Sequence, residues 1–248
     1  MIQLFNEIFS KPIFNLLIFL YTTIPGHDLG LAIILLTIII KLLLWPLSNG
    51  ALRSQKALTD IQPKLEALKK QYAGKEKQEE LAREMMALYS KEKVSPFSSC
   101  LPVLIQLPVF IALYHALSQG LKSSGFDQLY PFVTNPGTIT PTLFGFVNLA
   151  NPSIPLAVLA GVSQYFQAKM MVTRQQPRKT PGAGDEDMLA TMNKQMLYMM
   201  PVLTVILGWK LPGGLALYWL LTNVLTVLQQ KLYFKHADKG PDVVPAKP

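Results

Sequence analysis

The amino-acid sequence predicts an all-α integral membrane protein, with five transmembrane helices and a helical hairpin outside the bilayer. Half of its 248 residues are apolar, its mean hydropathy is +0.28, and only 15% of its residues are charged. Soluble domains carry about 25% charged residues. The charges are also clustered, because Lys41 is the single formal charge within four apolar stretches, at 29–47, 101–117, 154–168 and 215–228.

Five spans are predicted, since a transmembrane helix needs roughly 20 mostly apolar residues. They lie at about 29–48, 99–119, 153–171, 196–211 and 213–234. Pro212, Gly213 and Gly214 are turn formers, so the last two spans should form a tight hairpin of short helices. The chain then divides into an N-terminal segment, a first span, a polar hairpin, a four-span region and a tail, at 1–28, 29–49, 50–97, 98–234 and 235–248.

The N-terminal segment lacks the features of a cleaved signal peptide, because its first nine residues contain no basic side chain and no A-x-A site follows. Apolar side chains recur there at helical spacing between polar ones, at Ile2, Phe5, Ile8 and Phe9. We therefore expect an amphipathic helix that lies in the outer membrane interface and breaks at Pro12. The apolar run at 13–24 leaves a short or re-entrant span as the alternative.

Basic residues indicate the orientation of the spans. Segment 50–97 carries ten Lys and Arg residues, segment 172–195 carries four, and the tail 235–248 carries three, with Lys231 just before it at the end of the last span. Three others fall on the opposite side, at Lys11, Lys122 and Lys210. Because basic residues concentrate on the cytoplasmic side, we expect these three segments in the cytoplasm, the N-terminus outside and the C-terminus inside.

Segment 50–97 is predicted to form two helices joined at Ala73–Gly74 and ended by Ser95–Pro96. Apolar residues recur at helical spacing on each arm, at Leu65, Leu68 and Tyr72 and at Leu81, Met85 and Leu88. Ten basic and seven acidic residues surround these narrow apolar faces. A solvated hairpin explains most of the charges, whereas a mobile cytoplasmic docking element explains why so little apolar surface is left for packing. The stretch 175–188 has the composition of a flexible loop.

The chain contains no motif of a nucleotide-binding loop, a zinc protease or a serine hydrolase, so we predict no enzymatic activity, no metal site and no cofactor. His27, His115 and His236 are scattered, and the single cysteine excludes an internal disulfide. A Ser–Lys dyad would use Lys41 as its base. However, Ser48 is two turns away along the same helix.

Lys41 is the exception within the spans, and two interpretations fit it. It lies about six residues, or ~9 Å of helix rise, from the end of its span, so its side chain could snorkel to the headgroups. Alternatively, it faces the bundle interior together with polar residues of its own span and of the other spans. These are Thr37, Gln106, Ser163, Gln164, Gln167, Trp219, Thr222, Asn223 and Thr226.

The predicted spans contain no Asp or Glu, so they offer Lys41 no counter-ion. This disfavours an ion-coupled carrier, which would normally use an intramembrane carboxylate. An unpaired ammonium has to be hydrated or to meet a charge that arrives from elsewhere. A wet cavity, reached from the cytoplasm and lined by amides, would solvate polar stretches of a passing chain, and Lys41 would attract their carboxylates.

Two stretches resemble the signature segments of the YidC-type membrane protein insertases (the YidC/Oxa/Alb family). They are EMMALYSKEKVSPFSSCLPVLIQLPVFIALYHAL at 84–117 and PGGLALYWLLTNVLTVLQQKL at 212–232. The resemblance extends over nearly the whole chain and implies five core helices around a hydrophilic groove, open to the cytoplasm and to lipid and closed outside. It also implies insertion of membrane proteins without nucleotide hydrolysis, alone or beside the Sec translocon.

On this resemblance, the family's groove arginine falls on Lys41, which keeps the charge but loses the forked guanidinium donors. The groove threonine falls on Thr37, the second-span glutamine on Gln106, and the last-span aromatic pair on Tyr218 and Trp219. The expected groove residues are therefore Lys41, Thr37, Gln106, Gln164, Gln167, Tyr218, Trp219, Thr222 and Asn223.

Nascent membrane proteins and the lipid bilayer are the expected partners, and the Sec translocon is a further candidate. We expect neither the large periplasmic domain found in family members from Gram-negative bacteria nor a long basic C-terminal tail, so a ribosome contact would fall to the hairpin and the short tail. No transit-like leader is present, which predicts a bacterial plasma membrane. The alternative function is a small-solute channel or transporter, which would open at both faces, whereas an insertase would admit water on the cytoplasmic side alone.

The expected topology can be tested by labelling single cysteines in intact cells, in a Cys100→Ser background. Cysteines at Gln78 and Gly184 should resist impermeant thiol reagents, because both positions lie in segments predicted to be cytoplasmic. A cysteine at Lys122 should react from outside and serves as the control. If both predicted cytoplasmic positions are labelled from outside, the predicted topology is wrong.

Overall fold

The computed structural model describes residues 2–72, 77–95, 101–122, 125–175 and 188–237. Helices dominate it, in the order α1 (Ile2–Phe5), α2 (Lys11–Thr23), α3 (Leu29–Leu43), α4 (Trp45–Asp60), α5 (Gln62–Gln71), α6 (Gln78–Lys91), α7 (Leu101–Leu121), α8 (Ile154–Gln175), α9 (Met188–Lys210) and α10 (Gly213–Ala237). Two short strands, β1 (Thr142–Leu143) and β2 (Val147–Asn148), pair antiparallel between α7 and α8.

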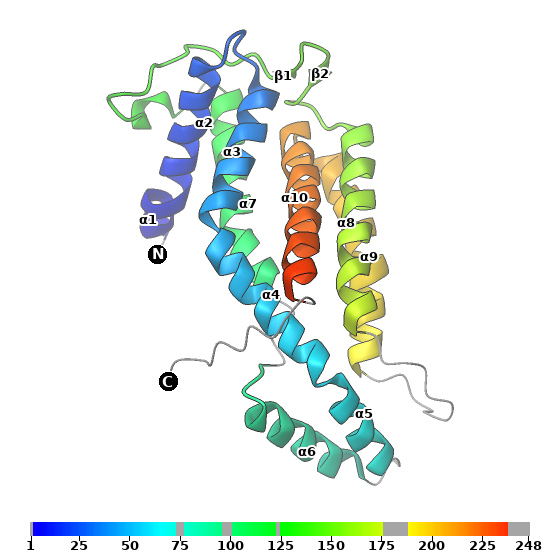
Figure 1. Cartoon of the computed structure of the whole chain (residues 1–248). Coiled ribbons are helices and arrows are strands. Elements are labelled where there is room, and N and C mark those ends of the chain that lie inside the picture. Colours follow the sequence, from blue (N-terminus) through cyan, green and yellow to red (C-terminus); the bar gives the residue numbers. More distant parts are fainter. Residues whose placement is uncertain (1, 73–76, 96–100, 123–124, 176–187, 238–248) are drawn as a thin grey trace.

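Figure 1 shows the long helices side by side in one bundle, with different structures at its two ends. Helices α5 and α6 extend from one end, which we call the hairpin end. The connection between α2 and α3 and the strands β1 and β2 lie at the opposite end, which we call the loop end. The mostly helical structure agrees with the predicted fold class.

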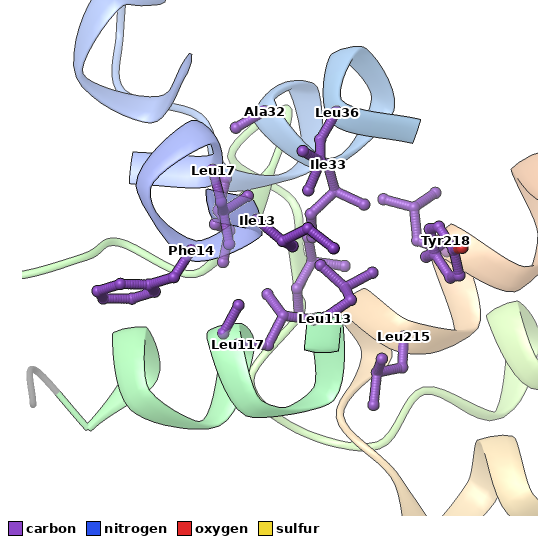
Figure 2. Packing of buried hydrophobic residues seen from close by; sticks show 14 of the residues in the cluster. Ile13, Phe14, Leu17, Ala32, Ile33, Leu36, Leu113, Leu117, Leu215 and Tyr218 are labelled. Carbon is purple, nitrogen blue, oxygen red and sulfur yellow. The ribbon is translucent and has the colours of Figure 1, made fainter. Parts of the chain in front are cut away.

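The main hydrophobic core lies where α2, α3, α7 and α10 meet. Figure 2 shows its side chains converging from all four helices, namely Ile13, Phe14, Leu17, Ala32, Ile33, Leu36, Leu113, Leu117, Leu215 and Tyr218. Full burial of one such aliphatic side chain contributes roughly 1.5–3 kcal/mol in water, but in a bilayer close packing has to supply much of the association energy.

Helices α8, α9 and α10 pack closely through small residues. A Cβ atom at Gly208 of α9 would lie 2.8 Å from the Cβ atom of Ala157 on α8, which is too close for any side chain. Gly161 of α8 is similarly covered by Val205 of α9. Small residues at such contacts let the helix backbones approach each other, as is common between transmembrane helices.

The first predicted span is not one straight helix. Helix α3 ends at Leu43, and the helical segment from Trp45 to Gln71 continues at 62° to it. Pro46 explains the bend, because its ring cannot donate a hydrogen bond and collides with the carbonyl of Leu42 one turn earlier. Hydropathy alone missed this bend, since the apolar run continues through Leu47.

The break predicted at Pro12 is wrong. A π-helical turn at Asn6–Ser10 joins α1 directly to α2, and helical structure continues from Ile2 to Thr23. Pro12 occupies the first turn of α2, where its missing N–H is tolerated. Helix α2 packs along α3 and α7 and buries Ile13, Phe14 and Leu17 in the main core. The predicted position of this segment in the outer interface stays a prediction.

Length and composition mark few helices as membrane spans on their own. Among the described residues, Gln3–Thr23 and Leu104–Leu121 are long and apolar enough to cross a bilayer, and the bent pair α3 and α4–α5 is a third candidate. Leu197–Lys210 of α9 is apolar but shorter. The predicted number of five spans therefore stays a prediction.

Helices α5 and α6 lie side by side as two arms and share a small core of their own. Leu58, Ile61, Leu65 and Tyr89 are buried together, and burial raises the pKa of the Tyr89 phenol. Lys64 and Glu92 join the arms through an ion pair of 2.5 Å. The predicted turn at Ala73–Gly74, Pro96, the loop 176–187 and the tail 238–248 lie outside the described residues.

We expect the amides of α5 and α6 to exchange faster than those of α3 and α10, because the hairpin core is small and separate from the main core. Leu65→Ala should accelerate exchange in both arms further, since removing a fully buried leucine costs about 2–5 kcal/mol. Hydrogen–deuterium exchange with mass spectrometry measures both effects. Equally slow exchange in α5, α6 and α10 would mean that the hairpin is a rigid part of the bundle.

Candidate functional site: a polar track along helix α10

One face of α10 carries polar side chains over most of its length. Tyr218, Thr222, Thr226 and Gln229 follow one another at intervals of four, four and three residues, which places them on the same side of the helix. Three of the four are buried, with exposed fractions of 2% for Tyr218, 6% for Thr222 and 3% for Gln229. We call these four residues the polar track.

Three other helices contribute a partner to the polar track. The amide of Gln106 on α7 donates to the Tyr218 hydroxyl. The Lys41 ammonium on α3 donates to the Thr226 hydroxyl at 2.7 Å. At the hairpin end, the amide nitrogen of Gln229 donates to the side-chain oxygen of Asn49 on α4 at 2.9 Å.

Lys41 points into the bundle, because its partner Thr226 lies on a different helix. This contact agrees with the interior interpretation and disagrees with snorkelling to the headgroups. The Thr226 hydroxyl donates in turn to the backbone carbonyl of Thr222 at 2.6 Å. A hydroxyl can orient an ammonium but cannot neutralise it. Within the described residues Lys41 forms no ion pair, so its charge is left for another partner.

Some predicted groove residues lie next to the track without bonding to it. Thr37 is fully buried and donates to the carbonyl of Ile33 on its own helix at 2.6 Å, so its hydroxyl is already used. Trp219 packs its ring edge-to-face against Phe110 of α7, with ring centroids 5.2 Å apart. Neither side chain is bonded to the track, so the assignment of both residues to the groove stays a prediction.

The polar residues of α8 divide into two kinds. Asn223 of α10 is buried and donates to the Ser163 hydroxyl at 3.0 Å and to the Ala160 carbonyl at 3.3 Å, so it joins α10 to α8 on a second face. Gln164 and Gln167 are half-buried, and among the described residues neither forms a hydrogen bond with Lys41 or with the polar track. Their assignment to the groove stays a prediction.

Sequence reasoning missed the hairpin end of the track. Gln229 continues the Thr222 and Thr226 stripe by one further turn, so helical periodicity could have found it. Asn49 gave no comparable signal, because it lies just beyond the apolar run and looks like an ordinary surface residue in the sequence. Its contact with Gln229 depends on the bend between α3 and α4.

Two more glutamines are buried on the helices that this contact joins. Gln55 of α4 is 4% exposed and Gln230 of α10 is 2% exposed. The side-chain nitrogen of Gln55 and the side-chain oxygen of Gln230 have no hydrogen-bond partner in the part of the chain that the structure describes. A buried polar atom without a partner costs about 1–3 kcal/mol, so each of these two atoms lowers the stability of its surroundings.

The segment 126–151 covers the loop end of the bundle and hydrogen-bonds to α2, to the N-cap of α3 and to the start of α10. Asn15 of α2 accepts from the N–H of Tyr130 at 2.6 Å and donates to the carbonyl of Gln128 at 3.2 Å. The Tyr21 hydroxyl accepts from the N–H of Thr140 at 2.9 Å. Side chains of α2 thus satisfy backbone groups of a segment more than a hundred residues away.

Asp28 anchors the strands β1 and β2 at the same end. Its carboxylate accepts from the N–H of Leu31, which caps α3, and from the N–H of Phe144, at 2.8 and 2.5 Å. Phe144 has φ = +53°, an unusual value for a bulky residue, and the bond to Asp28 helps to hold it there. Leu143 lies directly over Gly30 of α3, where a Cβ atom would collide with it.

The backbone of α10 completes the closure. The N–H groups of Gly213 and Gly214 donate to the carbonyls of Asn151 and Leu149, at 2.9 and 3.0 Å. Leu149 is fully buried in the main core. The strands and this loop were not predicted from the sequence. Together they place apolar, hydrogen-bonded structure at the loop end, whereas Lys41, Asn49 and Gln229 lie toward the hairpin end.

Comparison with known proteins finds one matching family and a group of similar relatives. The family described as 60Kd inner membrane protein matches residues 19–240. The chain is 36% identical over 230 residues to "Membrane protein insertase YidC" of Syntrophobacter fumaroxidans. It is 32% identical over 237 residues to the protein of the same name from Oceanobacillus iheyensis. It is 33% identical over 224 residues to "Membrane protein insertase MisCA" of Bacillus subtilis.

The matched regions differ in how much of each relative they cover. They include 92%, 94% and 89% of this chain, in the same order. They include 84% of the Oceanobacillus protein and 74% of the Bacillus protein, but 38% of the Syntrophobacter protein. The chain therefore spans well under half of the length of that longer relative.

Asp28→Ala should loosen the loop end, because it removes both the cap of α3 and the bond to Phe144. Loss of a helix cap costs about 0.5–2 kcal/mol, and the free energy of unfolding should fall by about 2 kcal/mol in total. Thermal unfolding in detergent and amide exchange at 140–150 measure the change. Asp127→Ala, at an exposed carboxylate of the same segment, should leave stability within about 0.5 kcal/mol. Equal effects of the two substitutions would contradict the anchoring role of Asp28.

Proposed function

This chain belongs to the 60Kd inner membrane protein family, and we propose that it is a membrane protein insertase. It moves polar segments of client proteins past the polar track and releases their hydrophobic spans into the bilayer. Its clients are nascent membrane proteins and its surroundings are lipid. No step of this process requires a reaction at the track, which agrees with the non-catalytic role given by the names of the relatives.

The observation that carries the proposal is an interior ammonium without a counter-ion. Lys41 meets the hydroxyl of Thr226, and no carboxylate among the described residues pairs with it. A fixed structural charge would normally be paired, because leaving it alone in a low dielectric is expensive. A charge that attracts carboxylates of passing clients has to stay unpaired between clients. This requirement fits an insertase.

The proposed path is a groove that opens toward the hairpin end and toward lipid and ends below the loop end. The buried polar atoms of Tyr218, Thr222 and Gln229 support a polar path along α10. The hydrogen bonds that Asp28 and Asn15 accept from backbone N–H groups of the loop segment support closure at the other end. A small-solute channel would need an opening at both ends, so this asymmetry favours the insertase.

A Ser–Lys hydrolase has less support from the geometry. The partner of the Lys41 ammonium is the hydroxyl of Thr226, and that hydroxyl already donates to the Thr222 carbonyl. A nucleophile would instead have to donate its proton to the lysine. In the hydrogen bond between Lys41 and Thr226, however, the lysine is the donor and the hydroxyl is the acceptor.

We place the protein in a bacterial plasma membrane, with the hairpin end in the cytoplasm, the C-terminus inside and the N-terminus outside. The concentration of basic residues in 50–97 supports this orientation. The exposed charges of α5 and α6, including Arg83 and Lys64, give the hairpin a surface that fits the ribosome as a partner. The Sec translocon is proposed as a second partner on the family relationship alone.

Lys41→Ala should impair insertion of clients with acidic residues beside their first span and spare clients without them. At an effective dielectric of about 20, a carboxylate ~4 Å from the ammonium gains roughly 4 kcal/mol of Coulomb energy, and desolvation takes much of it back. We expect a loss of about tenfold in insertion rate for acidic clients. Insertion into liposomes that contain the purified protein, scored by protease protection, measures this rate.

Lys41→Arg is the matched control, because it keeps the charge and should retain insertion of acidic clients. Thermal unfolding of each variant separates a loss of function from a loss of fold. If Lys41→Ala stays folded and inserts every client at the normal rate, the charge has no part in client binding. The insertase mechanism would then have to depend on the uncharged polar residues alone.

A further inference from the structure

Amide side chains join α4 to α10 at the hairpin end of the polar track, on helices that also bury apolar residues such as Leu52 and Phe234. Gln229 donates to Asn49 across this contact. Buried Gln55 on α4 and buried Gln230 on α10 each keep one unpaired polar atom. Apolar residues at these positions would leave no buried polar atom unpaired, so stability alone does not explain the choice of amides on the two helices.

The contact lies on the way to Lys41. Gln229 is three residues beyond Thr226 along α10, or ~4.5 Å closer to the hairpin end. Figure 1 shows the lower part of α10 beside α4. A polypeptide that approaches the Lys41 ammonium from the hairpin end therefore meets Asn49 and Gln229 first.

A side-chain amide carries the same donor and acceptor as a peptide group. The bond between Gln229 and Asn49 can therefore be exchanged for bonds to a client backbone, with no net loss of hydrogen bonds. An extended client segment needs such partners, because its N–H and C=O groups lose water when it leaves the cytoplasm. These groups occur in every client, whatever its side chains are.

We propose that Asn49 and Gln229 bind the peptide backbone of the arriving client segment, by exchanging their mutual hydrogen bond for bonds to one of its peptide groups. The inference rests on the proposed insertase function and deepens it. Lys41 recognises the charge of some clients, whereas Asn49 and Gln229 recognise the backbone that all clients share. The bend at Leu44 and Pro46 gives α4 a place to pivot away from α10 when the exchange occurs.

The test uses the full chain in liposomes and two clients that differ in one segment, acidic in the first and with Asn and Gln in place of Asp and Glu in the second. Asn49→Leu/Gln229→Met replaces the amide contact with an apolar one of similar size. Asn49→Gln/Gln229→Asn exchanges the two amides and keeps both. Gln71→Met, at an exposed glutamine of α5, is the control for loss of an amide elsewhere.

The apolar pair should slow insertion of both clients by about fivefold, as expected for one lost hydrogen bond. The exchanged pair and Gln71→Met should insert both clients at close to the normal rate. Lys41→Ala should affect the acidic client alone, so the two sites give different patterns. Thermal unfolding in detergent checks each variant, and the single Gln229→Met decides the matter if the apolar pair loses its fold.

Normal insertion by a folded apolar pair would overturn the proposal, because Asn49 and Gln229 would then only hold α4 against α10. A defect confined to the acidic client would also overturn it, since the pair would then act through Lys41. Equal loss in the exchanged pair would show that packing, and not amide chemistry, matters. If the unaltered protein inserts neither client above empty liposomes, the insertase function itself fails, which is a distinct result.

Discussion

The arrangement of the bundle depends on one constraint, which is the position of the Lys41 ammonium between α3 and α10. Its only described partner is the Thr226 hydroxyl, which orients the ammonium without neutralising it. A buried carboxylate would have paired the charge and ended its availability to other chains. Thr37, one turn earlier on α3, does not compete, because its hydroxyl is bonded to its own helix. The charge is thus held in place and kept free.

The loop end and the hairpin end of the bundle differ in how their segments are held. At the loop end, Asn15, Tyr21 and Asp28 satisfy backbone groups of the segment 126–151, most of which lies outside helices and strands, so this segment can cover the bundle without leaving those groups unpaired. At the hairpin end, α4 follows a proline bend, continues into a separate small core and carries a buried glutamine with an unpaired amide nitrogen. The two ends of the bundle therefore differ in how their segments are bonded. Such an asymmetry suits a protein that admits chains from one side.

Helical content and the exceptional position of Lys41 could be predicted from the sequence, because hydropathy and an isolated charge are local signals. The contact with Thr226 was also within reach, since the polar stripe of α10 follows helical periodicity. The position of Asn49 beside Gln229 was not, because it depends on the angle set at Pro46. The strands β1 and β2 were missed for a similar reason. They depend on Phe144 at positive φ, held by a carboxylate from another part of the chain, and no local pattern predicts that.

A charge and a pair of amides on one path have different consequences for which clients can be handled. Attraction to Lys41 varies with the acidic residues of a client and falls with ionic strength where water reaches the site. Hydrogen bonding to peptide groups is nearly independent of client sequence and of salt. An insertase that used the ammonium alone would favour acidic segments, and one that used amides alone would hold every extended chain equally. On the proposed path Asn49 and Gln229 lie before Lys41, so backbone binding would come first and admit any extended segment, and charge would then determine which segments go further.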